Sequence, residues 1–264
     1  QLFKDCLGSA GWHEPTQPEI EGMGLSGYEY PEATCDNLDN DCNGLTDDGL
    51  GACVTVEDIA LGERHTCAVL TGGTLYCWGY NWYGQLGDGT TDDKLSPTPV
   101  PGLGDVAQIA AGEHHTCAVL TDGAASCWGS NWKGQLGDGT IVSKYSPTPV
   151  PGLGDVAQIA AGRWHTCAVF TGGAVSCWGE NEYGQLGDGT TVDKHSPTPV
   201  PGLGNVARIA AGKLHTCALF TGGAVSCWGY NYYGQLGDGT YGNHKTSPTP
   251  VPGLGAVAQI AAGS

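Results

Sequence analysis

A run of acidic and amide side chains near the amino end of the chain has the spacing of a cation-binding loop. Asp39, Asp41 and Asn43 alternate along the chain and are followed by Gly44. Oxygen ligands at every second residue, with a glycine that permits a sharp turn, are how a short loop wraps around a hard cation. We therefore predict calcium as a cofactor. The predicted ligands are side-chain oxygens and one backbone carbonyl, from Asp39, Asp41, Asn43, Leu45, Asp47 and Asp48.

This loop departs from a complete EF-hand, because Leu50 stands where the closing glutamate would be. Asp36 or Asp48 would supply the missing bidentate ligand. The segment resembles instead the aspartate-rich, cysteine-flanked calcium repeats of thrombospondin type 3, which also implies calcium. The alternative is an acidic loop, rich in turns and held by disulfides, that binds no metal.

Cysteine spacing is a second chemical signal. Eight of the 12 cysteines form one pair in each of four similar segments, namely Cys67/Cys77, Cys117/Cys127, Cys167/Cys177 and Cys217/Cys227. A glycine-containing turn separates the two members of each pair, so both lie on the arms of one hairpin. With a turn at 71–73, Cys67 lies opposite Cys77, close enough for a disulfide. A cysteine metal site is the less favoured alternative, because the spacing contains no CxxC.

The other four cysteines lie near the amino end, and we expect the pairs Cys35–Cys42 and Cys6–Cys53. Disulfides at this density are typical of exported proteins, so we predict an extracellular or cell-surface location. No signal peptide is visible at Gln1, and we therefore expect the sequence to be a mature form.

The paired cysteines belong to a longer repeat with a period of about fifty residues. Four copies and a partial fifth span 56–105, 106–155, 156–205, 206–256 and 257–264. Each full copy has a short apolar strand, a hairpin with the two cysteines, and a proline-containing stretch that must lie at a sheet edge. This pattern predicts an all-β fold, a β-propeller of four-stranded blades with an extra strand at its end.

Residues 1–53 do not repeat and are strongly acidic. We therefore predict two domains. The first, 1–53, is a small, irregular, disulfide-stapled module that binds calcium. The second, 54–264, contains the propeller repeats.

The letters shared by the copies, IAAGxxHTCAVxTxGxVxCWGxNxxGQLGDGT, are similar to the repeat of the regulator of chromosome condensation family. The resemblance covers about Val56 to Ser264 and implies a β-propeller, usually of seven blades, that acts as a protein-binding scaffold. One relative of this kind is a secreted bacterial inhibitor of β-lactamases. Nucleotide exchange on a small nuclear GTPase is not implied, because that activity needs a full ring and particular loops.

Residues present in every copy are expected to build the blade, whereas residues that differ are free to bind a ligand. The repeated histidines, tryptophans and turn aspartates, such as His65, Trp78 and Asp88, are therefore interpreted as structural. The varying aromatic side chains should gather on one propeller face as a binding surface. They are Tyr80, Trp82, Tyr83, Trp132, Trp164, Tyr183, Tyr230, Tyr232 and Tyr233. Drift of unconstrained loop sequences is the alternative.

Charge and missing motifs argue against several classes of function. The net charge of −17 disfavours binding to nucleic acid or to an anionic membrane. We expect no membrane insertion, because no apolar run is long enough to span a bilayer. Hydrolase, zinc-protease and nucleotide-binding fingerprints are missing from the sequence. We therefore expect that the protein is not an enzyme.

These features predict a secreted structural or adhesive protein that presents its propeller face to a protein or glycan. The final stretch, Val257–Ser264, has no hairpin behind it and is expected to pair head to tail with another copy, giving oligomers or filaments. Closure of a small ring in cis and a longer parent chain are the alternatives. A rival function is a monomeric protein-binding module, such as an inhibitor of a secreted enzyme. An enzyme with carboxylates in the propeller channel is less favoured.

Overall fold

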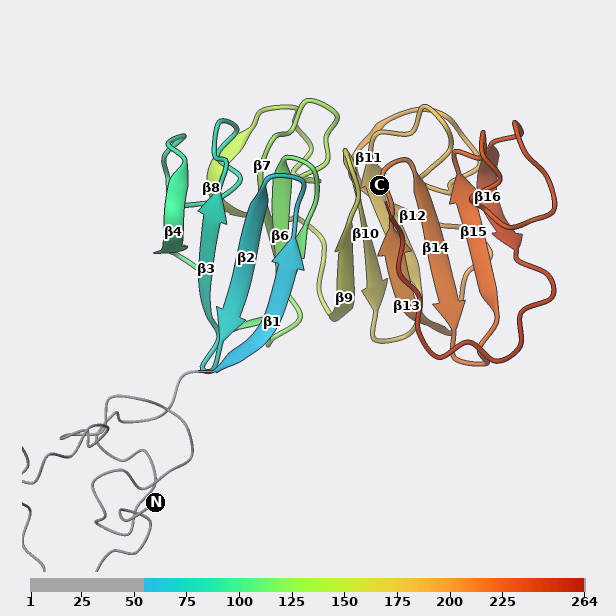
Figure 1. Ribbon diagram of the computed structural model, residues 1–264, viewed down its shortest axis with the longest axis horizontal. Helices are drawn as coiled ribbons and strands as arrows, with labels where there is room; N and C mark the ends of the chain where they lie inside the picture. The colour runs from blue at the N-terminus through green and yellow to red at the C-terminus, as the bar shows by residue number, and fades with distance from the viewer. Residues whose placement is uncertain (1–54, 264) are drawn as a thin grey trace, which may run out of the picture. The chain divides into compact units, whose positions relative to one another are not determined.

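The computed structural model describes residues 55–263 and has an all-β architecture (Figure 1). The predicted module 1–53, with its calcium loop and its four cysteines, lies outside the described residues. Within 55–263, no helix is long and apolar enough to cross a membrane.

Four antiparallel sheets, each with four strands in chain order, form the blades of this part of the chain. Blade 1 comprises β1 (Val56–Leu61), β2 (His65–Leu70), β3 (Thr74–Gly79) and β4 (Lys94–Pro99). Blade 2 comprises β5 (Val106–Ala111), β6 (His115–Leu120), β7 (Ala125–Gly129) and β8 (Lys144–Pro149). Blade 3 comprises β9 (Val156–Ala161), β10 (His165–Phe170), β11 (Val175–Gly179) and β12 (Lys194–Pro199). Blade 4 comprises β13 (Val206–Ala211), β14 (His215–Phe220), β15 (Val225–Gly229) and β16 (Lys245–Pro250). The predicted β-propeller fold is confirmed.

The central hairpin of each blade carries the disulfide predicted from cysteine spacing. Cys67 on β2 lies directly opposite Cys77 on β3, and their Cα atoms are 4.1 Å apart. The other blades repeat this bond at Cys117–Cys127, Cys167–Cys177 and Cys217–Cys227. Each bond ties the two central strands of one blade together, and within 55–263 no disulfide links two blades.

The outermost strand of each blade contains the prolines. In blade 1, Pro97 and Pro99 lie on β4, which pairs only with β3. Proline has no N–H to donate, so the unpaired side of an edge strand is where it fits. This edge faces solvent, as the 99 % exposure of Leu95 shows.

One set of polar contacts around a buried histidine recurs at all three junctions between successive blades. Between blades 1 and 2, the Thr116 hydroxyl donates to the Gln85 carbonyl (2.7 Å), and Trp128 Nε1 donates to the same oxygen (3.0 Å). His65 Nε2 lies 2.9 Å from Thr116 Oγ1. Because the only hydroxyl proton goes to Gln85, His65 must donate from Nε2. We call this set the inter-blade lock; its later members are His115, Thr166, Gln135 and Trp178, then His165, Thr216, Gln185 and Trp228.

Burial keeps the lock histidines neutral. Desolvation lowers the pKa of His65 to about 4 and those of His115 and His165 to about 3. A neutral imidazole has one N–H, which the lock places on Nε2, and Nδ1 has no hydrogen-bond partner among the described residues. The repeated histidines therefore have the structural role that their repetition indicated.

Apolar side chains fill the space around each lock. Trp128 is fully buried and packs with Val69, Leu75 and Leu86 of blade 1. A Cβ on Gly87, whose φ is +75°, would lie 2.5 Å from the indole nitrogen of Trp128, so glycine allows this loop to approach the ring. Each core is thus shared by two blades, as expected of a repeat protein.

The partial fifth copy does not form a strand in the described residues. Val257 and Ile260 are half-buried against blade 4, at the place that Val206 and Ile209 take against blade 3. A strand needs a hydrogen-bonded neighbour in its own sheet, and within 55–263 this segment pairs with no strand. The predicted extra strand is therefore present as an irregular segment, 257–263.

Candidate functional site: the upper face

Two parts of every repeat lie at the same end of the blade. In blade 1 they are the turn after the first strand, 62–64, and the long loop after the third strand, 80–93. Both lie at the end drawn uppermost in Figure 1. We call this end of the four blades the upper face. The nine aromatic residues that the sequence predicted for a binding face all lie in these turns and loops.

Repeated polar residues hold each long loop in place. The buried Asn81 donates from Nδ2 to Asp88 (3.1 Å) and accepts from the Leu86 N–H (2.9 Å). Asp88 accepts from the Thr90 N–H (2.9 Å) and pairs with Lys94 (3.1 Å). Burial opposes ionisation of Asp88, but the hydrogen bonds from Thr90, Lys94 and Asn81 outweigh it and lower the pKa of its carboxyl. The loops therefore display their variable side chains on a fixed frame.

The junction of blades 1 and 2 carries a first aromatic cluster, formed by Tyr80, Tyr83, His114 and Trp132. The Tyr83 ring centroid lies 4.7 Å from that of His114 and 5.1 Å from that of Trp132. Tyr80 contacts Tyr83 edge to face at 6.2 Å. Trp132 is 62 % exposed, so a large flat ring is available to a partner.

The junction of blades 3 and 4 carries a second aromatic cluster, formed by Tyr183, Tyr230, Tyr232, Tyr233 and His244. Tyr230 lies at its centre, 4.8 Å from Tyr183 and 4.9 Å from His244 between ring centroids. Tyr232 and Tyr233 meet at 5.0 Å and are 58 % and 81 % exposed. This cluster therefore also offers aromatic surface to solvent.

The junction of blades 2 and 3 is charged. Lys133 Nζ lies 3.3 Å from Asp193 Oδ2 and 3.8 Å from Glu180 Oε1. Glu180 is buried, and desolvation raises the pKa of its carboxyl although Lys133 opposes the shift. Gln185 Nε2 donates to the other oxygen of this carboxylate (3.1 Å). The upper face thus alternates aromatic, charged and aromatic junctions.

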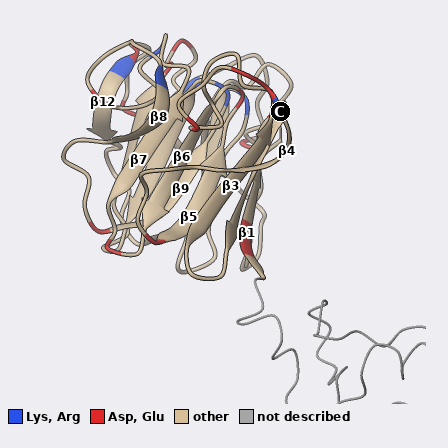
Figure 2. Cartoon of the chain, turned by 90° about the vertical axis from the view of Figure 1, so that its left-hand side faces the viewer, with Lys and Arg blue, Asp and Glu red and all other residues tan. Residues whose placement is uncertain are grey.

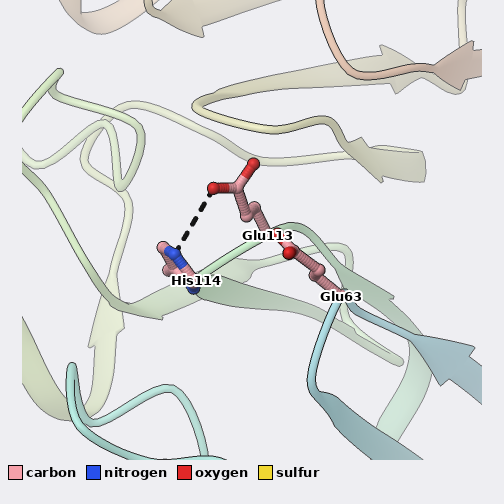
Figure 3. Close-up of side chains that lie close together, drawn as sticks. All are labelled: Glu63, Glu113 and His114. Carbon is pink, nitrogen blue, oxygen red and sulfur yellow. Dashed lines mark ion pairs between the residues drawn. The ribbon is translucent and has the colours of Figure 1, made fainter. Parts of the chain in front are cut away.

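Three side chains that can bind a metal ion lie close together in the turns that follow the first strands of blades 1 and 2: Glu63, Glu113 and His114 (Figure 3). Their ligand atoms lie within 4.8 Å of one another. Glu113 is already paired with Arg163 (2.7 Å) and with His114 (3.4 Å). Because Arg163 neutralises Glu113, we describe this group as a polar part of the upper face. Next to this group, the turns that follow the first strand of each of the four blades line a cavity of about 370 Å³.

One buried amide beneath the first aromatic cluster lacks an acceptor. Gln135 Nε2 donates to Ser130 Oγ, and Gln185 Nε2 donates to Glu180. The residue of blade 1 that corresponds to the acceptors Ser130 and Glu180 is Tyr80. Gln85 Nε2 therefore has no hydrogen-bond partner among the described residues. A tyrosine in place of a polar partner therefore leaves a free donor under the aromatic rings.

The structure gathers most, but not all, of the aromatic residues that the sequence placed on a binding face. Seven lie in the two clusters: Tyr80, Tyr83, Trp132, Tyr183, Tyr230, Tyr232 and Tyr233. Trp82 and Trp164 lie outside both, the latter under the Arg163 guanidinium at 3.9 Å. His114 and His244 were missed as members. Both occupy positions that differ between copies, and that signal was available.

Blades that share their cores, with variable side chains gathered at one end, define a repeat protein of the β-propeller class. Models of the regulator of chromosome condensation (RCC1) repeat match 72–119, 122–169, 172–219 and 222–264, well over half of the chain. A second RCC1 repeat model matches 56–85, 106–135, 156–185 and 206–235. The chain therefore belongs to the RCC1 repeat family, and this membership indicates a protein-binding module.

Known proteins resemble parts of the chain. The secretion-regulating guanine nucleotide exchange factor of Bos taurus is 46 % identical over 52 residues, 19 % of this chain and 11 % of that protein. Human WBSCR16 superimposes with a TM-score of 0.73 at 29 % identity, covering 79 % of this chain and 56 % of that one. Prp20p of Saccharomyces cerevisiae, described with its binding to Gsp1p and histones, has a TM-score of 0.66 at 26 % identity. The match covers 55 % of Prp20p and 80 % of this chain. The chain thus spans about half the length of these structures and about a tenth of the curated relative.

Proposed function

We propose that the protein is a non-enzymatic binding module whose upper face holds a protein partner. One observation carries this proposal: seven of the nine predicted aromatic side chains gather into two partly exposed clusters on a rigid frame. Exposed tryptophan and tyrosine, fixed in place, are the residue types that dominate protein-binding hot spots. The charged junction between the clusters would orient the partner. A glycan is the second ligand that such rings would suit.

The test compares two variants of the full chain as bait for extracellular proteins. Trp132→Ala with Tyr233→Ala removes one exposed ring from each aromatic cluster. Leu95→Ala, on the exposed edge strand β4, is the matched control. A partner held by the native chain and by the control, and lost by the double variant, supports the proposal. Equal retention by all three baits would place binding elsewhere and refute it.

We further propose an extracellular or cell-surface location and a structural or adhesive role. Disulfides in every blade favour an oxidising compartment. Calcium binding by residues 35–49 belongs to the same proposal. Calorimetric titration should detect saturable calcium uptake that disappears in Asp39→Ala with Asp41→Ala. The rival function, inhibition of a secreted enzyme, predicts that the captured partner is an enzyme and that its activity falls on binding.

A second candidate function is self-association, head to tail, into oligomers or filaments. The supporting observation is that blade 1 leaves apolar surface exposed, which would contact the unlike outer surface of blade 4 in a second copy. Val56 and Ile59 of blade 1 are 59 % and 55 % exposed, whereas Val106 and Ile109 of blade 2 are 2 % and 5 % exposed. Because the two surfaces are unlike, their contact would be heterologous and would give rings or open fibres.

A further inference from the structure

We propose that blade 1 of one copy docks against blade 4 of a second copy through an additional inter-blade lock. This inference rests on the self-association proposed above and names the surfaces and residues that perform it. Its basis is the repetition of one contact geometry at all three junctions within the chain. The two outer blades each carry one half of that contact.

Blade 1 carries the donor half. Thr66 and Trp78 are the counterparts of Thr116 and Trp128, which are fully buried in the junction of blades 1 and 2. Thr66 and Trp78 are instead partly exposed. Together with the exposed Val56 and Ile59, they form what we call the front surface of blade 1, which has the composition of the buried junction surfaces.

Blade 4 carries the acceptor half. A cavity of about 490 Å³ lies beside β14 and is lined by Leu214, His215 and Gln235 and also by residues 261–263, whose displacement would open it further. At the inner junctions, the counterparts of His215 and Gln235 hold a threonine hydroxyl and an indole N–H. Within 55–263 neither His215 Nε2 nor the Gln235 carbonyl has such a partner. We call this cavity the indole socket, because its counterparts each contain a buried tryptophan.

The outer surfaces of blade 1 and blade 4 also carry opposite charges. Within the chain, Arg163 and Glu113 occupy equivalent positions on adjacent blades and form an ion pair at 2.7 Å. Blade 4 has Lys213 at this position, and blade 1 has Glu63. Placing blade 1 of a second copy next to blade 4 would therefore bring opposite charges together.

A second pair of charges follows the same register. Asp58 Oδ2 accepts from the Ile109 N–H of the next blade (3.0 Å), and Gln108 and Gln158 make the corresponding contacts further along. Blade 4 has Arg208 at this position, and a guanidinium cannot accept from the Ile59 N–H of a second copy. Arg208 would instead donate to the Ile59 carbonyl, as Gln108 and Gln158 donate to the next blade, beside the acidic residues of β1 that are red in Figure 2. Basic residues on blade 4 thus meet acidic residues on blade 1.

Segment 257–263 lies where the second copy's β1 would pack. The Val257 N–H donates to the Gly223 carbonyl (3.0 Å), as the Val206 N–H does to Gly173 (3.1 Å). The segment's apolar side chains are less covered, since Val257 and Ile260 are half-buried whereas their counterparts Val206 and Ile209 are 4 % and 3 % exposed. Its counterpart of Asp58 is the uncharged Gln259. Docking therefore displaces this segment, in contrast to the expectation that the segment itself pairs with another copy.

The test uses charge exchange in the full 264-residue chain, measured by sedimentation velocity over a concentration series. Lys213→Glu and Glu63→Lys should each weaken self-association roughly tenfold, because each places like charges in contact. Mixing the two variants should restore association, since Glu at 213 of one then meets Lys at 63 of the other. Asp122→Lys, on an exposed turn of blade 2, is the matched control and should associate like the native chain.

Two results separate the inference from the proposal beneath it. A native chain that stays monomeric at every concentration overturns both self-association and the docking geometry. A native chain that associates, with variants and mixture unaffected, overturns the docking geometry alone.

Two further variants test the docking geometry independently: a chain that lacks 257–264, and Trp78→Ala. Their self-association is measured in the same way. The truncated chain should associate as strongly as the native chain or more strongly, because a competitor for the blade 4 surface is gone. Trp78→Ala should associate more weakly, because the socket loses its occupant. Loss of association in the truncated chain would refute displacement of the segment and with it this docking geometry.

Discussion

The inter-blade lock and the upper face are built from the same repeats. The lock is the same at every junction, whereas the upper face differs from one junction to the next. At the lock, all three junctions use histidine, threonine, glutamine and tryptophan in the same contacts. On the upper face, no two junctions agree: one is a tyrosine–tryptophan cluster, one is charged and one is a tyrosine cluster. The lock is shielded from water, so every copy must satisfy its polar groups in one way. The upper face meets solvent, so its side chains are free to differ and to recognise a partner.

The largest effect should come from the centre of a lock. Trp128→Ala removes a fully buried ring and the donor to the Gln85 carbonyl. We expect the free energy of unfolding to fall by about 3–5 kcal/mol. Urea denaturation followed by circular dichroism measures it. A loss below about 1 kcal/mol would mean that the junction does not depend on its tryptophan.

Removal of one blade's disulfide should have the next largest effect. Cys117→Ala with Cys127→Ala opens a hairpin whose cysteines are 10 residues apart in sequence. Closing so short a loop contributes about 2–3 kcal/mol in the chain-entropy account. Denaturation of this variant beside the native chain tests the value. Peptide mapping without reduction should recover Cys117 linked to Cys127, and a link between neighbouring blades would contradict the structure.

The lock should also make stability depend on pH. Burial lowers the pKa of His115 to about 3, whereas the unfolded chain binds a proton near pH 6.5. The unfolded state therefore binds more protons between these values, so stability is present above about pH 6.5 and is lost as the pH falls towards 3. The loss attributable to His115 is on the order of 2 kcal/mol between pH 7 and pH 5.

The measurement compares urea midpoints at pH 7 and pH 5 for the native chain and for His115→Gln. Glutamine can donate to Thr166 but does not titrate, so the variant should lose less stability on acidification. Leu95→Gln, on the exposed edge strand β4, removes no titratable group and should keep the native slope. Equal slopes in all three proteins would show that the lock histidines do not control the pH dependence.

The smallest effect on stability should come from the upper face. Trp132→Ala removes a ring that is 62 % exposed, and we expect the free energy of unfolding to change by less than about 0.5 kcal/mol. The same urea series measures it beside Trp128→Ala, so two tryptophans of one blade are compared directly. A cost near that of Trp128→Ala would show that the first aromatic cluster holds blades together, and the proposed division between lock and face would fail.

Local sequence was sufficient where a contact lies within one hairpin. The short glycine turn sets the register, and the register places Cys67 opposite Cys77, so the disulfides were predictable. The edge position of the proline strand followed from the missing N–H of Pro97 and Pro99. Variation between copies pointed to seven rings that do cluster, although variation alone could not separate Trp82 from them.

Contacts between blades could not be predicted in the same way. His65 was recognisable as structural, but its partner Thr116 lies 51 residues away and is reached only when blades stack. The irregular course of 257–263 was missed for the same reason. The sequence of this segment matches the first strand of each blade. Whether it forms a strand depends on a hydrogen-bonded neighbour, and the motif itself does not contain one.

By itself, the sequence determined the repeat, the four-stranded blade, the hairpin disulfides and the separation of constant from variable positions. These features depend on turn geometry and on alternation along a strand, which act over a few residues. Only the tertiary structure decided how the blades meet and which rings cluster. Those features arise where segments about fifty residues apart share one buried core, and burial sets which polar atoms must be paired.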